Sequence, residues 1–265
     1  MPSDVIDYQI IGDDIQAVII TLDPGEACIA EAGAMMYMED GIEMGTSLSM
    51  SPDGKGLMGK LFEAGKRAVT GESFFITVFA NAGRQRADCA FAAPFPGHIV
   101  PVELADHAGT IICQKDAFLC GARGIEVSIA FQRKLGVGLF GGEGFILQKV
   151  TAQSREGQVF LHAGGSVIQR QLGPGQTLRV DTGCLVGFEP SVQYDIQFVK
   201  GIKNKLFGGE GLFYAKLTGP GTVWLQTLPF SRLADRIIAS APAHGGDSKG
   251  EGSVLGGVFR MIDGR

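Results

Sequence analysis

Short apolar runs, separated by turns that contain glycine, follow one another along most of this chain. Residues 5–22 alternate between apolar and polar positions and are interrupted once, at residues 12–14. Alternation with a period of two is typical of β-strands, so we expect two strands there. The next apolar run, at 27–31, follows a Pro-Gly turn at 22–26, where proline fixes its own φ and glycine supplies a positive φ. The pattern predicts an all-β fold.

One motif, in which glycine and glutamate open an apolar run, occurs three times. Its copies are Thr70-Gly71-Glu72-Ser73-Phe74-Phe75, Leu139-Phe140-Gly141-Gly142-Glu143-Gly144-Phe145-Ile146 and Leu206-Phe207-Gly208-Gly209-Glu210-Gly211-Leu212-Phe213. The three glutamates are about 70 residues apart, which is too long for a solenoid repeat. The spacing suits a small β-sheet unit that is repeated three times.

Two further units recur in the same order along the chain. A turn, a strand, a corner of small residues and a second strand occur near residues 22–38, 102–120 and 172–188. A strand with the pattern Gly-x-Val-aromatic-Leu closes the last two copies, and residues 86–91 are a weak first copy. We therefore expect residues 1–230 to form one β domain of three antiparallel sheet repeats that face a shared core about a pseudo-threefold axis. The expected repeats span about 5–100, 101–168 and 169–230.

Helical patterns are scarce and lie in two places. Residues 57–69 place most apolar side chains on one side and lysine or arginine on the other, which predicts a short amphipathic helix or an ordered loop. Residues 231–239 predict a helix with Ser231 as its N-cap. The following stretch is rich in Ala, Pro, Gly and Ser, so we expect 231–265 to be a C-terminal helix with a mobile tail.

Composition and charge exclude several classes of function. The formal net charge of −5 gives no general attraction to phosphates, which disfavours nucleic acid as a partner. The chain shows neither a basic, apolar leader nor an apolar run of about 18 residues, so we expect a cytoplasmic protein. The five cysteines are odd in number, lack a Cys-x-x-Cys pair and lie among apolar or small residues. They predict buried free thiols in a reducing compartment.

The repeated Gly-Gly-Glu-Gly motif, the Pro-Gly turns at 24–25 and 174–175 and the closing Gly221-Thr222-Val223-Trp224-Leu225-Gln226 together resemble a known family. It is the mitochondrial-biogenesis family, whose eukaryotic members are named for altered inheritance of mitochondria and whose bacterial members are filed as a domain of unknown function. The resemblance covers about residues 5–230. It implies a fold grouped with the tryptophan RNA-binding attenuator protein (TRAP-like) and related to double-stranded β-helices. It further implies a homo-oligomer, with a trimer favoured, and no established reaction, cofactor or catalytic residue. The first repeat departs from the motif, with Ser73 in place of glycine.

The candidate site residues are the repeated glutamates Glu72, Glu143 and Glu210. If the repeats gather them near one axis, their carboxylates could hold a cation through oxygen ligands or share a proton. The alternative is structural, with each carboxylate accepting hydrogen bonds from backbone N–H groups at a glycine-rich turn. A repeated structural role explains the repetition with no further assumption.

Other residue types give no recognisable site. The histidines, at 98, 107, 162 and 244, contain no His-x-His pair, and we expect each to be satisfied or exposed. No Gly-x-Ser-x-Gly or Walker-type loop occurs, and the Gly-x-Gly-x-x-Gly spacing at 136–141 does not lie between a strand and a helix, as a dinucleotide site would require. We expect Trp224 to lie in the core rather than to stack on a base. The methionines Met35, Met36, Met38 and Met44 form either an adaptable contact surface or a core-filling strand pair.

These observations favour a non-enzymatic oligomeric scaffold or interaction protein without a cofactor. Such a protein would present its tail and segment 57–69 to an unknown protein partner or a membrane surface. The alternative is a module that binds a small ligand or metal on the pseudo-threefold axis, or an enzyme without a recognisable motif. RNA binding is a distant third hypothesis.

Overall fold

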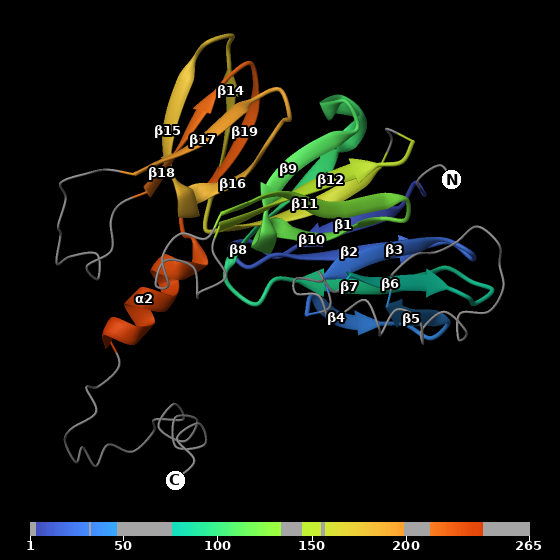
Figure 1. Cartoon of the computed structure of the whole chain (residues 1–265). Coiled ribbons are helices and arrows are strands. Elements are labelled where there is room, and N and C mark those ends of the chain that lie inside the picture. The colour runs from blue at the N-terminus through green and yellow to red at the C-terminus, as the bar shows by residue number, and fades with distance from the viewer. Residues whose placement is uncertain are drawn as a thin grey trace, which may run out of the picture. The chain divides into compact units, whose positions relative to one another are not determined.

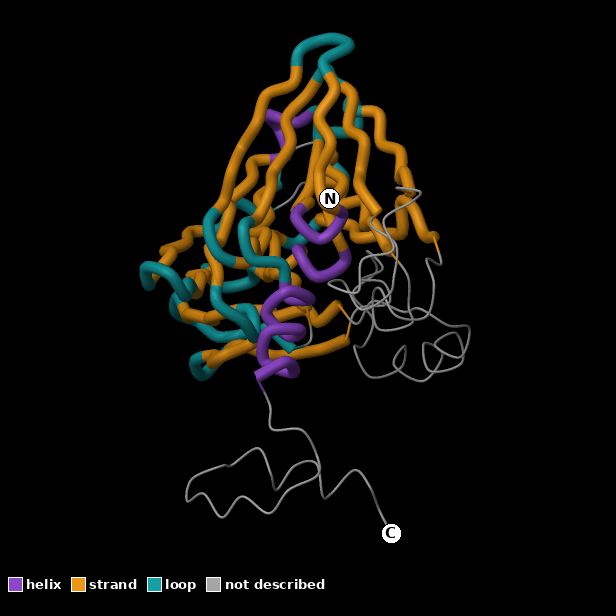
Figure 2. Tube along the Cα trace, turned by 90° about the vertical axis from the view of Figure 1, so that its left-hand side faces the viewer, coloured by secondary structure: helices purple, strands orange, loops and turns teal. Residues whose placement is uncertain are grey.

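Antiparallel β-strands make up most of the described structure. The computed structural model describes residues 4–31, 33–46, 76–133, 145–154, 157–198 and 213–240. Figure 2 shows strands as the predominant element and the longer helix leading to the C-terminal end of the described chain. The predicted fold class, all-β with a short C-terminal helix, is confirmed.

The described strands form four sheets, here called A to D (Figure 1). Sheet A has the order β1-β2-β7-β4, and these strands are Asp7–Ile11, Ala17–Leu22, Ala87–Ala92 and Met35–Met38. Sheet D has the order β15-β18-β17, and these strands are Thr177–Asp181, Phe213–Thr218 and Gln193–Phe198.

Sheets B and C each contain six strands. Sheet B has the order β5-β6-β3-β10-β13-β8, from Ile42–Thr46, Ile76–Asn81, Ala27–Glu31, Phe118–Ala122, Gln158–Gly164 and Gly97–Glu103. Sheet C has the order β11-β12-β9-β16-β19-β14, from Ile125–Arg133, Phe145–Ala152, Thr110–Gln114, Leu185–Phe188, Gly221–Gln226 and Val167–Leu172. Three short 3-10 helices connect strands: η1 (Leu104–His107), η2 (Lys115–Ala117) and η3 (Thr182–Cys184).

The two Pro-Gly turns adopt the same hydrogen-bonded structure. In the first, the carboxylate of Glu26 accepts a hydrogen bond of 2.8 Å from the backbone N–H of Asp23. In the second, the amide oxygen of Gln176 accepts one of 3.0 Å from the N–H of Gly173. The glycine that follows proline has a φ of +88° in the first turn and +73° in the second. The turn chemistry predicted from the sequence is therefore confirmed in both copies.

The apolar core consists of three clusters, each between two successive sheets. The first joins sheets A and B and includes Phe79, Phe91 and Phe160, all fully buried. The second joins sheets B and C and includes Trp224, only 2% exposed, so its predicted place in the core is confirmed. The third joins sheets C and D. Fully burying one such side chain stabilises the fold by about 1.5–3 kcal/mol.

This arrangement corrects one expectation about the repeats. We expected the repeats to face a single shared core, whereas sheets B and C each bury both faces in different clusters. Strand β10, in the middle of sheet B, is accordingly a continuous apolar run that is buried at every position. The pseudo-threefold axis is not confirmed and stays a prediction.

The C-terminal helix α2 runs from Phe230 to Ser240, close to the predicted 231–239. The prediction that Ser231 is its N-cap is wrong. Ser231 lies inside the helix, and the backbone N–H of Arg232 already donates to the carbonyl of Pro229 at 3.0 Å. Contacts divide the chain into residues 1–232 and residues 233–265, and 233–240 are the described part of the second unit. The predicted helix at 57–69 and the tail after Ser240 lie outside the described residues.

Candidate functional site

Glu72, Glu143 and Glu210 all lie outside the described residues. Both hypotheses for these glutamates, an axial ligand site and a structural hydrogen-bond acceptor, stay predictions. Among the residues that are described, no group of three or more His, Cys, Asp or Glu side chains is arranged to hold a metal ion.

Two of the histidines have polar partners, as predicted. Nδ1 of His98 lies 2.6 Å from the carbonyl oxygen of Gly165, and Nδ1 of His107 lies 2.6 Å from a carboxylate oxygen of Glu189. Burial raises the pKa of Glu189, but hydrogen bonds from His107 and Thr222 outweigh it and leave the pKa below its usual value. Glu189 is therefore a carboxylate held ionised by its neighbours, which is a structural role.

His162 on β13 is buried and lacks a hydrogen bond at one ring nitrogen. The prediction that this histidine is either satisfied or exposed is therefore wrong. Its side chain is 3% exposed, and Nδ1 has no hydrogen-bond partner in the described part of the chain. The pKa of His162 is lowered to about 4, chiefly by burial. A hydrogen bond to the Phe95 backbone raises this pKa in part, and the charge of His98 lowers it further. At neutral pH the ring is therefore uncharged, with one nitrogen that can accept a hydrogen bond. His244 lies outside the described residues.

A pocket of about 250 Å³ lies beside His162. Its apolar wall includes the aromatic rings of Phe95, Phe118 and Phe230. The ring of Phe95 lies edge-on to the imidazole of His162, with centroids 4.5 Å apart, and 5.3 Å from the ring of Phe230. An apolar pocket with few polar groups is the usual form of a small-molecule site.

Two carboxyl groups, Glu31 and Asp116, complete the polar part of this pocket. Burial raises the pKa of Glu31, the negative charge of Asp116 raises it further, and Lys115 opposes both effects. A positively charged group beside the two carboxyl groups would therefore be stabilised. It offers a ligand an apolar surface and an acidic end.

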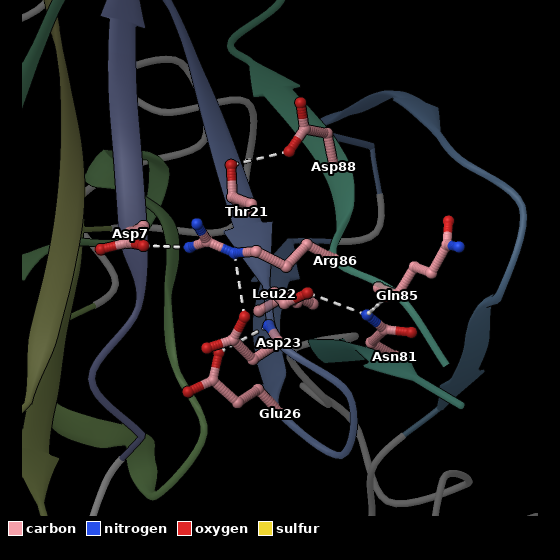
Figure 3. A network of polar contacts seen from close by, with 9 residues as sticks. All are labelled: Asp7, Thr21, Leu22, Asp23, Glu26, Asn81, Gln85, Arg86 and Asp88. Carbon is pink, nitrogen blue, oxygen red and sulfur yellow. Dashed lines mark hydrogen bonds and ion pairs between the residues drawn. The ribbon is translucent and has the colours of Figure 1, made fainter. Parts of the chain in front are cut away.

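A polar network around Arg86 joins β1 to the first Pro-Gly turn (Figure 3). The guanidinium contacts the carboxylate of Asp7 and, through Nε, that of Asp23 at 2.9 Å. Nearby, the side chain of Asn81 donates two hydrogen bonds of 2.8 Å to backbone carbonyls and accepts one from Gly83. These groups satisfy one another and hold the turns, so the network is structural.

The cysteines confirm the prediction of buried free thiols. All five are free, four are buried and Cys184 is partly buried. Burial raises the pKa of Cys113 to about 12. Burial also raises the pKa of Cys120 well above its usual value, and the charge of Cys89 adds to this. Thiols of this kind are not the deprotonated nucleophiles that covalent catalysis needs.

An exposed apolar strand forms the most distinctive surface in the described structure. Strand β4 has all four side chains exposed, and we call Met35, Met36, Tyr37 and Met38 the methionine edge. Their exposures range from 36% to 56%. Met44 on β5 is also exposed, at 53%. Of the two hypotheses for these methionines, the core-filling strand pair is wrong and a contact surface remains.

Relatives of the chain can now be compared. The family model described as mitochondrial biogenesis AIM24 matches residues 8–228, which is most of the chain. The chain belongs to the AIM24 family. The chain is also similar to an uncharacterised protein of Streptococcus pyogenes serotype M6, with 29% identity over 226 residues. The alignment covers 85% of this chain and 86% of the relative. The resemblance inferred from the repeated motifs is confirmed at the level of the family.

A crystal structure of a Streptococcus pyogenes protein shares the fold. It aligns with 89% of this chain and 100% of its own chain, with a TM-score of 0.69 and 24% sequence identity. At this identity the likeness concerns the fold alone. None of the described helices is long and apolar enough to cross a bilayer.

Sequence reasoning missed the pocket and could not decide on the methionine edge. The polar groups of the pocket come from Glu31, Asp116 and His162, which lie far apart in the sequence and in no motif. The methionine edge was noticed as a cluster, but a run of apolar residues is equally typical of a buried strand. The strand is exposed because it is the outer strand of sheet A in the described structure, and the sequence of β4 does not encode this position.

Proposed function

We propose that this protein is a non-enzymatic interaction protein that assembles into a homo-oligomer. The observation that carries the proposal is the methionine edge, where four consecutive large side chains are exposed on one strand. Large apolar surfaces of soluble proteins usually serve as contacts with other proteins. Methionine and tyrosine are enriched at such contacts because they offer adaptable or amphipathic surfaces.

Three finer expectations belong to this proposal. A trimer is the form favoured by the family resemblance, the cytoplasm is its expected location, and the TRAP-like group is its expected fold family.

A strand with free backbone groups at its outer side is a suitable contact element, since it can add another strand to its sheet. The methionine edge is such a strand, because β7 is its only partner in the described structure.

The experiment measures the mass of the full chain by light scattering and by sedimentation equilibrium. Replacing two exposed side chains, Met36→Glu with Met38→Glu, should convert an oligomer into monomer, because the charges would have to be buried in the contact. The matched control is Ile168→Glu, at a residue that is 46% exposed on β14, and it should leave the oligomer intact. A monomeric parent chain, or an oligomer that tolerates both methionine substitutions, would refute the proposal.

A second candidate function is binding of a small cationic molecule in the pocket. The acidic pair Glu31 and Asp116, beside aromatic walls and an unpaired nitrogen of His162, supports it. Calorimetric titration with phenethylamine tests it, with phenylacetate as the matched anionic probe. Binding of the amine that weakens in Glu31→Gln supports a ligand site, whereas equal heats for both probes would argue against one.

A further inference from the structure

The order of strands in sheet C repeats that in sheet B. Adding six to every strand number of β5-β6-β3-β10-β13-β8 gives β11-β12-β9-β16-β19-β14, which is the order of sheet C. Each of these sheets consists of two three-stranded halves. The half β5-β6-β3 in sheet B joins the half β10-β13-β8, and the contact runs between β3 and β10. In sheet C the same contact runs between β9 and β16.

Sheets A and D contain one such half each. Subtracting six from β10-β13-β8 gives β4-β7-β2, which is sheet A without β1. Adding six to β11-β12-β9 gives β17-β18-β15, which is sheet D. The strands that join the halves in sheets B and C therefore correspond to β15 in sheet D and β4 in sheet A. Neither β4 nor β15 has a described strand on that side (Figure 1).

The correspondence extends to single residues and to an irregularity. Strand β4 pairs with β7 through Met35 and Tyr37, with a register shift between them. Strand β10 shows the same shift in its pairing with β13, and β16 shows it in its pairing with β19. The matching positions are Met35, Phe118 and Leu185, then Tyr37, Cys120 and Gly187, then Met38, Gly121 and Phe188. A bulge is a specific feature of a strand, so these three strands are equivalent.

Burial differs between these equivalent strands as expected if β4 and β15 each have a free side. All residues of β10 and of β16 are buried, whereas all residues of β4 are exposed. On the other side, β3 has four buried residues of five, whereas β15 has one, Val180. The strands β5, β8, β11 and β14 are edge strands too, but they are the edges of the six-stranded sheets B and C. Among the described strands, only β4 and β15 are edge strands whose counterparts in sheets B and C are paired on both sides.

We propose that β4 of one copy of this chain pairs, antiparallel, with β15 of a second copy. The proposal rests on the proposed function, and it names the partner and the register of the methionine edge. The joined sheet would have the order β17-β18-β15 followed by β4-β7-β2, the order of sheets B and C, with β1 added at its margin. It would also reproduce their packing, because sheet D packs on sheet C and sheet A packs on sheet B.

The register follows from the pairs seen within the chain. Cys120 lies opposite Ala30, and its counterpart Gly187 lies opposite Cys113. In the pairing of β15 with β18, Val180 holds the position that Ala30 holds in the pairing of β3 with β6. Tyr37 of one copy therefore lies opposite Val180 of the next, and Met38 opposite Arg179. Because the two contact surfaces differ, copies add head to tail and form a closed ring or a filament.

The experiment introduces one cysteine into each of two full-length variants, in a background with Cys184→Ser, because Cys184 is the least buried of the native thiols. Tyr37→Cys is mixed with Val180→Cys, subunits are exchanged, and disulfide formation is followed under mild oxidation. Directly opposite residues of antiparallel strands have Cβ atoms about 4.5–5.5 Å apart, close enough for slow disulfide formation. The matched control mixes Tyr37→Cys with Thr177→Cys, three residues out of register.

The mixture of Tyr37→Cys and Val180→Cys should give covalent dimers at least about tenfold faster than the control or either variant alone, because pairing raises the local thiol concentration. An oligomer that gives no such preference would overturn the β4–β15 pairing and leave the proposed function standing. Equally fast cross-linking of Tyr37→Cys alone would show that β4 pairs with β4, which also overturns it. A monomer by light scattering would overturn both proposals.

Discussion

Acid should destabilise this protein through His162. Burial holds its pKa at about 4 in the folded state, compared with 6.5 for an ordinary histidine, so the unfolded chain binds an additional proton between these values. This contribution to stability is complete above the unfolded pKa and is lost as the pH falls towards the folded one. A shift of one pKa unit corresponds to about 1.4 kcal/mol, so the loss between about pH 7 and about pH 5 is about 2 kcal/mol.

The assay is urea unfolding at a series of pH values, followed by the fluorescence of Trp224. This tryptophan is the only one in the sequence and is buried, so its emission reports the loss of the core. The substitution His162→Gln removes the titration while keeping a polar side chain. The comparison with the parent is needed because Glu31, whose pKa burial raises, titrates with the opposite effect on stability.

The parent should lose about 2 kcal/mol more than His162→Gln between about pH 7 and about pH 5. The control His98→Gln removes a neighbouring imidazole that has a hydrogen-bond partner, and it should keep most of the parent's slope. If His162→Gln shows the same pH dependence as the parent, the buried neutral imidazole is not responsible and the reasoning from burial is wrong.

Four further substitutions test the packing and the turns, all by urea unfolding at neutral pH. Phe160→Ala should cost about 3–5 kcal/mol, because the ring is fully buried and lies edge-on to Tyr8, whereas Ile168→Ala at an exposed position should cost less than about 1 kcal/mol. Gly97→Ala should cost more than about 2 kcal/mol, because its Cβ would lie 2.2 Å from the carbonyl oxygen of Ala163. Gly175→Ala should cost only about 1 kcal/mol, because its φ is +73° but the site is open. Equal costs for the two glycine substitutions would contradict the contact argument.

The parts of the fold that could be predicted are those set by neighbouring residues. The Pro-Gly turn with Glu26 and the strand at Ala27–Glu31 were predicted with the observed bounds, because proline, glycine and an i+3 acceptor determine the turn locally. The start of α2 was misplaced by a residue because Ser231 is a good N-cap by type, yet the first turn already uses the carbonyl of Pro229.

The partners of the strands could not be predicted in the same way. Strand β3 pairs with β10, which is distant from it in the sequence, and neither strand carries a local signal for the other. Met35–Met38 and Phe118–Ala122 are both apolar runs, but a neighbouring strand covers only the second. The pocket at His162 depends on the same long-range arrangement, since Glu31 reaches it from β3.

The pairing of strands that are distant in the sequence has a consequence for how the chain folds during its synthesis. Strand β3 ends at Glu31 and cannot meet β10 until residues Phe118–Ala122 have left the ribosome. Such distant pairings slow folding, since the cost of closing a long loop comes before the gain from the contact. Strand β3 therefore lacks this neighbour during much of translation. A chain interrupted before Leu185–Phe188 is made would leave β9 without β16 beside it, and unpaired strand edges of this kind can pair with other chains.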